Sequence, residues 1–210
     1  MTSQPVKRAS PRPSPKERTR RLLSDAAREL LRTGAPLNVQ AAADLAGVSR
    51  ATAYRYFPSN EAVLMHATMP LLEDASQLRP PDPDAADNIS PQDLPEQASA
   101  LVRTMGKWAF DHENELRTLL RLSLAPERAT HMHRRGNTNR ERWIAALLEN
   151  LPAHVSQAAR DRLSVALVPL FGADAVVWST DIAHVDRDAA LDVMAWMAAT
   201  LVQATLDGGM

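Results

Sequence analysis

NVQAAADLAGVSRATAYRYFPSN, residues 38–60, is the most informative stretch of the sequence. Asn38 is a good N-cap for a short helix, and Gly47 is suited to end that helix in a left-handed turn. Ser49 then caps a second helix, Arg50–Tyr56. The alanines of the first helix are small enough to let the two helices pack closely around the glycine. The stretch therefore predicts a helix, a tight turn and a second helix, the sequence form of a helix-turn-helix.

Two further helices are predicted on either side of this stretch. Ser14–Glu17 forms a capping box with proline at the first helical position, and an apolar stripe at helical spacing follows it. Ser59 caps a helix that we expect to run to about residue 77, with a kink at Pro70. Residues 1–13 have no periodicity and are rich in proline and basic residues, so we expect a disordered basic arm.

Composition excludes several classes of protein. The 210 residues are 45% hydrophobic and 23% charged, which is ordinary for a soluble globular protein and too apolar for a wholly disordered chain. Cysteine is absent, so disulfides, thiolate metal sites and a cysteine nucleophile are excluded. The N-terminus lacks the apolar stretch of a secretory signal, and no uninterrupted apolar run reaches about 18 residues. We expect a cytoplasmic protein without a membrane helix.

The rest of the chain also has helical spacing. Residues 79–95 are rich in proline and predict a loop, and apolar stripes follow from Pro95 onward. The last two helices are expected at about Ser156–Asp181 and Asp188–Leu206. No segment has the period of a strand, so we predict an all-α fold of about nine helices. The predicted parts are the arm 1–13, a helix-turn-helix segment 14–58 and a further helical segment 59–210.

Charge is distributed unevenly along the sequence. Residues 1–60 carry eleven Lys and Arg against four Asp and Glu, a net charge of +7, and the remaining residues carry a net −8. A basic N-terminal part attached to an acidic body is typical of a polyanion-binding module with a separate second domain.

The N-terminal segment resembles the DNA-binding domain of the TetR family of transcriptional repressors. The resemblance covers about residues 15–66. It departs from the family pattern at Asn60, where the family usually has a lysine that contacts phosphate, and at Ala42, where it usually has a large aliphatic residue. The residues that carry the resemblance are Ala43, Ala46-Gly47-Val48-Ser49, Thr52, Tyr54, Tyr56-Phe57, Ser59 and Glu61-Ala62-Val63-Leu64.

The second helix of this motif would enter the major groove of DNA. Arg50 is the best candidate for a bidentate contact to guanine, and the tyrosine hydroxyls suit phosphates. Solvated surface charge is the alternative for the arginines, and the basic arm either grips DNA or is an unbound tail. The predicted DNA-binding residues are Gln40, Ser49, Arg50, Thr52, Tyr54, Arg55, Tyr56 and Asn60.

The resemblance implies that residues 14–58 are a DNA-binding domain and residues 59–210 a ligand-binding and dimerisation domain. It further implies a small-molecule pocket and a four-helix dimer interface in the C-terminal helices. Apolar walls would favour a largely apolar effector. Core filling is the alternative for each pocket candidate, and an intramolecular core is the alternative for the interface. The pocket candidates are Met105, Trp108, Leu120, Arg121, Trp143 and Trp178. The interface candidates on the last helix are Leu191, Met194, Ala198, Leu201 and Val202.

Signals for an enzyme are weak. The sequence has no HExxH, G-x-S-x-G or P-loop pattern, and we predict no catalytic residue and no cofactor. Two polar groups need an interpretation. Asp181, His184, Asp186 and Asp188 either bind a metal or cap and charge the start of the last helix, and we favour the cap. Arg134, Arg135, Arg140 and Arg142 are expected on a solvated helix face.

Together these patterns predict a homodimeric transcriptional regulator, a repressor, that binds a palindromic operator and is released by a small molecule. Two recognition helices would lie one DNA turn apart, ~34–36 Å. One alternative is a helical ligand-binding or enzymatic protein with a vestigial DNA-binding domain. Another is an architectural DNA-binding protein that does not repress.

Overall fold

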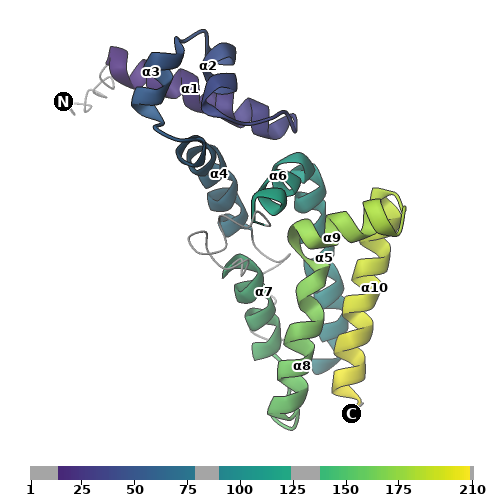
Figure 1. Ribbon diagram of the computed structural model, residues 1–210. Helices are drawn as coiled ribbons and strands as arrows, with labels where there is room; N and C mark the ends of the chain where they lie inside the picture. Colours follow the sequence, from purple (N-terminus) through teal and green to yellow (C-terminus); the bar gives the residue numbers. More distant parts are fainter. Residues whose placement is uncertain (1–13, 79–89, 124–137, 209–210) are drawn as a thin grey trace, which may run out of the picture. The chain divides into compact units, whose positions relative to one another are not determined.

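A computed structural model describes residues 14–78, 90–123 and 138–208, and all regular structure in these ranges is helical (Figure 1). The predicted all-α class is therefore confirmed for the described part of the chain. The chain divides into two compact units, residues 1–70 and 71–210. The predicted basic arm and the greater part of the proline-rich segment lie outside the described residues.

The first unit consists of α1 (Pro15–Arg32), α2 (Val39–Ala46), α3 (Arg50–Tyr56) and the first part of α4 (Asn60–Gln77). The helix caps that we predicted in this unit are confirmed. The capping box of Ser14 and Glu17 is formed at the start of α1. The side chains of Asn38, Ser49 and Ser59 accept backbone N–H bonds at the starts of the next three helices.

Gly47 makes the turn between α2 and α3 with φ 64°, a left-handed conformation that only glycine adopts without strain. The N–H of Val48 then bonds the carbonyl of Ala43 at 2.9 Å. The core beneath this turn is built largely from small side chains, so the helices approach closely. Its buried members are Leu23, Ala27, Leu31, Val39, Ala42, Ala43, Ala53, Phe57, Val63, Leu64 and Ala67.

The boundary between the units falls after Pro70, within α4. We predicted the division at residue 58. The start of α4 belongs to the first unit because Val63, Leu64 and Ala67 are buried there. The helix therefore belongs partly to each unit.

The second unit is organised around α5 (Leu94–Asp111) and α10 (Arg187–Leu206), which lie side by side and form its largest helix–helix contact (Figure 1). Gly106 on α5 permits a close approach, because a Cβ there would lie 2.6 Å from Cδ2 of Leu191. The other helices are α6 (Glu113–Ser123), α7 (Thr138–Glu149), α8 (Gln157–Leu167) and α9 (Gly172–Val177).

Two predicted segments differ in the structure. Residues 91–95, predicted as loop, form a 3₁₀ turn (Pro91–Asp93) and the start of α5, because the Ser90 side chain caps the turn. The single helix predicted at 156–181 is broken into α8, a 3₁₀ turn (Val168–Leu170), α9 and a π-helical turn (Trp178–Ile182). Pro169 has no N–H to donate, and Gly172 turns the chain with φ 75°. The described residues therefore contain ten α-helices rather than about nine.

The apolar stripe that we assigned to a dimer interface forms the core of the second unit instead. Met194, Ala198 and Val202 are fully buried, and Leu191 and Leu201 pack partly buried against the same cluster. The intramolecular alternative therefore holds for this stripe. The large apolar side chains that α10 leaves exposed are those of Val193 and Trp196.

Candidate functional site

Helix α3 exposes a basic and aromatic face. Arg50 and Tyr54 are both exposed, and the guanidinium of Arg50 lies 5.5 Å from the centroid of the Tyr54 ring. One turn further on, the guanidinium of Arg55 lies 5.9 Å from the Tyr56 ring. The opposite face is anchored by the fully buried Ala53. Each arginine is thus supported by a ring next to it while its charge stays in solvent.

The two hydroxyls at the start of α3 are bonded to each other. Ser49 Oγ accepts from the backbone N–H of Thr52 at 3.3 Å and donates to Thr52 Oγ1 at 2.9 Å. Thr52 is half-buried and Ser49 is exposed. Their first role in this structure is to hold the helix start, next to the exposed Arg50.

Gln40 and Asn60 take part in bonds within the unit. The Gln40 amide donates to Asp44 Oδ1 at 2.6 Å, four residues along α2. Asn60 Oδ1 accepts from the backbone N–H of Val39 at 3.0 Å, so the first residue of α4 helps to cap α2. We had expected only a phosphate contact from Asn60. No local signal predicts this cap, because its two residues are 21 positions apart.

Further basic side chains of the same unit are exposed on α1: Lys16, Arg18, Arg20, Arg21 and Arg28. His66 on α4 adds no charge to them at neutral pH. Its ring lies 5.3 Å from that of Phe57, and burial together with the charges of Arg20 and Arg28 lowers its pKa. The positive surface of this unit is therefore carried by arginine and lysine.

The six pocket candidates separate into three groups. Met105 and Trp143 are buried in one apolar cluster, and Trp108 and Trp178 pack against it partly buried. Leu120 is half-buried, whereas Arg121 is exposed, which does not suit a residue that lines a pocket. The structure thus brings four of the six to one cluster.

Trp108 has partners within the protein, and the nearby groove is lined by other residues than the six candidates. The indole N–H of Trp108 donates to Asp74 Oδ2 at 2.8 Å, and its ring stacks on His112 at 4.6 Å. A shallow groove of about 300 Å³ lies between α7 and α8, and none of the six candidates lines it. The groove is lined by Ala145, Leu148, Glu149, Gln157, Arg160, Asp161 and Ser164.

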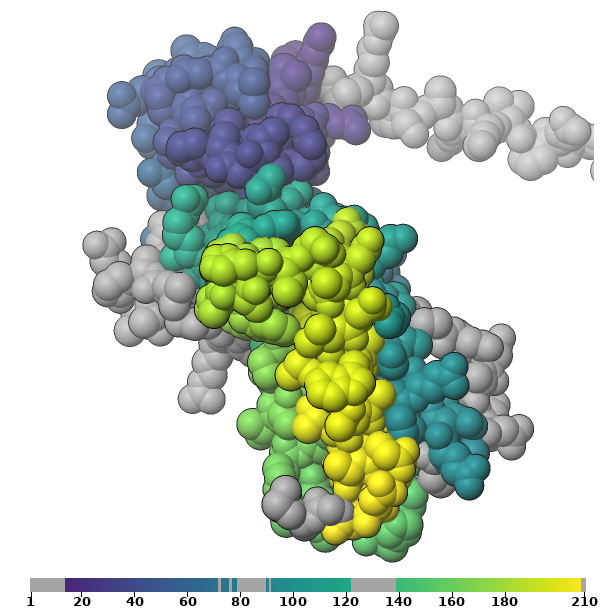
Figure 2. Space-filling view, turned by 90° about the vertical axis from the view of Figure 1, so that its right-hand side faces the viewer, coloured from purple at the N-terminus to yellow at the C-terminus, as the bar shows by residue number. Residues whose placement is uncertain are grey.

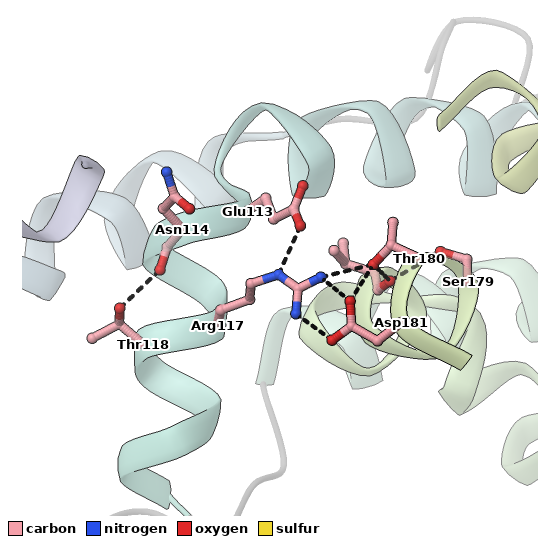
Figure 3. A network of polar contacts seen from close by, with 8 residues as sticks. Glu113, Asn114, Arg117, Thr118, Ser179, Thr180 and Asp181 are labelled. Carbon is pink, nitrogen blue, oxygen red and sulfur yellow. Dashed lines mark hydrogen bonds and ion pairs between the residues drawn. The ribbon is translucent and has the colours of Figure 1, made fainter. Parts of the chain in front are cut away.

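Arg117 on α6 binds the π-helical turn (Figure 3). Its two terminal nitrogens donate to the two oxygens of Asp181, each at 2.6 Å, and one also donates to Thr180. Its Nε donates to Glu113 at 2.7 Å. The hydrogen bonds from Arg117 lower the pKa of Asp181 to about 2. This network is a structural clamp between α6 and the turn.

The acidic group around Asp181 does not form a metal site. Asp181 is paired with Arg117, and Asp186 accepts from the N–H of Ala189 at 2.9 Å as the N-cap of α10. Among the described residues, no group of three or more His, Asp or Glu is arranged to hold a metal ion. The helix cap that we favoured is confirmed for Asp186.

We had expected Arg140 to lie on a solvated face of α7, and the structure does not place it there. Its side chain is 12% exposed, and one terminal nitrogen donates to Asp174 Oδ2 on α9 at 3.0 Å. The prediction was wrong because a sequence pattern along α7 does not reveal a partner 34 residues away. Arg142 is exposed, and Arg134 and Arg135 lie outside the described residues.

By length and composition, α10 is the one described helix that could cross a membrane. The segments 157–170 and 172–182 qualify only as one span broken by a bend of 62°. One side of α10 packs against α5, and core helices of soluble proteins often have the same composition. The property is weak evidence and assigns no location.

Comparison of the chain with protein-family models gives no match. A search of curated proteins gives no match either. The functional interpretation therefore depends on the motif residues and on the geometry described above.

Proposed function

We propose that this protein is a DNA-binding transcriptional regulator of the TetR type, and that α3 is its recognition helix. The observation that carries the proposal is the exposed face of α3, with Arg50 and Arg55 each supported by a tyrosine ring. That face directly follows the glycine turn after α2. It belongs to a segment with a net charge of +7. Such a helix suits the major groove, where arginine reads guanine and the phosphates attract the other basic groups.

Arg50 and Arg55 have different roles in this proposal. Arg50 is the first residue of α3, and residues at the start of a recognition helix reach base edges. Arg55 lies in the last turn and is assigned to phosphate. Tyr54 and Tyr56 hold the two guanidinium planes and offer their hydroxyls to the DNA backbone. The amide nitrogen of Asn60 would add a neutral phosphate contact while its oxygen keeps α2 capped.

We further propose that two copies associate through the exposed apolar faces of α8 and α10. Val165 is 72% exposed and Trp196 66% exposed, a costly arrangement unless another surface covers them. The two helices contact each other, and Figure 2 shows α10 along the front of the second unit with α8 beside it. Val193 on α10 is exposed as well. Closed twofold association would place two copies of α3 on one palindromic site.

The proposed regulation is release from DNA when a small molecule binds the second unit. Its cluster around Met105 and Trp143 is apolar and aromatic, as ligand sites generally are. The ligand must favour the conformation that does not bind DNA, and a 100-fold change in DNA affinity corresponds to ~2.7 kcal/mol of coupling. Helix α4 is continuous from the first unit into the second and is the covalent route for this coupling.

The test uses duplexes from upstream of the protein's own gene in a gel shift, with and without a metabolite extract. Arg50→Ala should cost ~1–3 kcal/mol on the specific duplex and relax sequence preference. Arg55→Ala should weaken specific and scrambled duplexes about equally. If Arg50→Ala leaves the ratio of specific to non-specific affinity unchanged, α3 does not read bases as assigned. If the protein binds a component of the extract but no duplex, its DNA-binding domain is vestigial.

A further inference from the structure

Two buried N–H groups on α7 have no hydrogen-bond partner. They are Nε of Arg140 and Nε1 of Trp143, which lie one turn apart on the same helix. Trp143 is only 6% exposed and the Arg140 side chain 12% exposed. A buried donor without an acceptor costs about 1–3 kcal/mol, and nearly all such groups in proteins are paired. Two on one helix turn point to an acceptor that the described residues do not supply.

The surroundings hold both donors in place. A terminal nitrogen of Arg140 donates to Asp174 at 3.0 Å, which ties the guanidinium to α9. Gly172, with φ 75°, leaves room for it, since a Cβ at that position would lie 3.0 Å from the same nitrogen. The Trp143 ring lies 6.1 Å from the Phe171 ring within the buried apolar cluster. The donors are thus fixed at the edge of an apolar environment.

We propose that Arg140 and Trp143 bind the carbonyl oxygen of a small organic ligand whose body is apolar. Both side chains are donors only, so the group that satisfies them must be an acceptor. An sp² oxygen has two lone pairs and can accept from both. An ammonium group would bring more donors to donors, and would be rejected. The proposal names the effector class of the regulator described above and depends on that function only for its consequence on DNA.

Charge selects between the two kinds of sp² oxygen. The positive charge of Arg140 is already paired with Asp174. A carboxylate would leave one negative charge without a partner beside buried apolar groups, which is unfavourable. A neutral ketone avoids this cost. The expected order of affinity is therefore ketone, then carboxylate, then amine for the same length of chain.

The test is calorimetric titration of the full-length protein with 2-nonanone, octanoate and octylamine in the absence of DNA. Trp143→Phe keeps an aromatic ring, though a smaller one, and removes the N–H. It should weaken the binding of 2-nonanone by about tenfold. Arg142→Gln, at an exposed position on the same helix, is the control and should not alter the affinity. Thermal melts of both variants check that they are folded. Unchanged affinity of Trp143→Phe, or saturable binding of neither oxygen probe, would overturn the proposal and leave the donors to buried water.

Asp174→Asn gives a second test that depends on charge alone. Removing the paired carboxylate should reverse the preference, so that octanoate binds more tightly than 2-nonanone. The same order as in the unmodified protein would contradict the assigned role of Arg140. Because these titrations contain no DNA, their result for the ligand site remains valid even if the protein is found not to bind DNA. A ketone that binds here without changing DNA affinity would confirm the site and refute only its regulatory role.

Discussion

The two units of this chain are specified in different ways. In the first unit, helix boundaries are set by capping residues directly beside the helix in the sequence, such as Asn38, Gly47 and Ser49. In the second unit, bonds between remote positions are prominent: Arg117 reaches Asp181, and Arg140 reaches Asp174. The first unit is therefore encoded by short-range signals that a sequence displays openly. The second depends on tertiary pairings that become visible only when the helices are placed.

The largest effect is expected from Arg160 in the second unit, whose side chain bonds several backbone carbonyls at once. Its guanidinium donates to the backbone carbonyls of Leu148, Val155, Leu151 and Pro152, at 2.7–3.2 Å, and so closes the end of α7. Arg160→Ala should lower the free energy of unfolding by about 2–3 kcal/mol, because several carbonyls lose a charged donor. Urea unfolding measures this loss.

Arg103→Ala is the matched control for that experiment. Arg103 also pairs across helices, with Asp192 at 2.7 Å, but both side chains are about half or more exposed. Its removal should cost about 0.2–1 kcal/mol. Equal losses for the two variants would show that the bonds of the partly buried Arg160 add no more stability than an exposed ion pair.

Gly47 tests the local kind of specification. Its φ is 64°, and a Cβ added there would meet no atom within 4 Å, so backbone strain is the only cost of a side chain. Gly47→Ala should lower stability by about 1–2 kcal/mol, and Gly47→Asn by less, since asparagine tolerates the left-handed region. Thermal melts of both variants measure the difference. Identical melting temperatures would mean that the turn is not held in this conformation.

Two substitutions at Asn60 distinguish its structural role from the proposed DNA contact. Asn60→Ala removes the acceptor for the Val39 N–H and should cost about 0.5–1 kcal/mol. Asn60→Asp keeps an acceptor at a helix start and should keep stability, but its negative charge should repel phosphate. Stability and DNA affinity are measured on the same samples. If Asn60→Asp binds DNA as tightly as the unmodified protein, Asn60 does not lie near the phosphates.

The smallest expected effect concerns pH. The pKa of Asp181 is lowered to about 2 from an ordinary value near 3.8, so the folded state binds this proton less readily than the unfolded state. The stabilisation is present above about pH 4 and is lost as the pH falls from about 4 to 2. Asp181→Asn should remove this part of the acid dependence in urea midpoints, and Arg117→Met should do the same. A variant that retains the full acid dependence would place its origin elsewhere.

The same contrast explains which features the sequence could predict. The helices of the first unit follow from caps and glycine at short range, and the predicted boundaries of α2 and α3 are confirmed. The cap between Asn60 and Val39 was missed because it joins positions that are far apart. In the second unit, Arg140 was misplaced for the same reason. Proline and glycine near residue 170 indicated a disturbance but not the π-helical turn that follows.

The exposed face of α10 could not be read from the sequence, because this helix is apolar on most sides. The stripe with Met194 faces α5, whereas Trp196 is left in solvent. Only the partner helix decides between two such faces. For the candidate site, the motif identified the exposed residues of α3. The buried donors of Arg140 and Trp143 have no sequence signal beyond their spacing on one helix face.

The central claim is that the first unit reads a DNA sequence as part of a twofold assembly. It is tested most directly by selection of bound duplexes from a random-sequence pool at physiological salt. The account predicts enrichment of an inverted repeat with half-sites about one helical turn apart, ~34–36 Å. It also predicts that the Arg50→Ala protein enriches a more degenerate motif. Recovery of unenriched sequences by the unmodified protein would contradict sequence reading by α3.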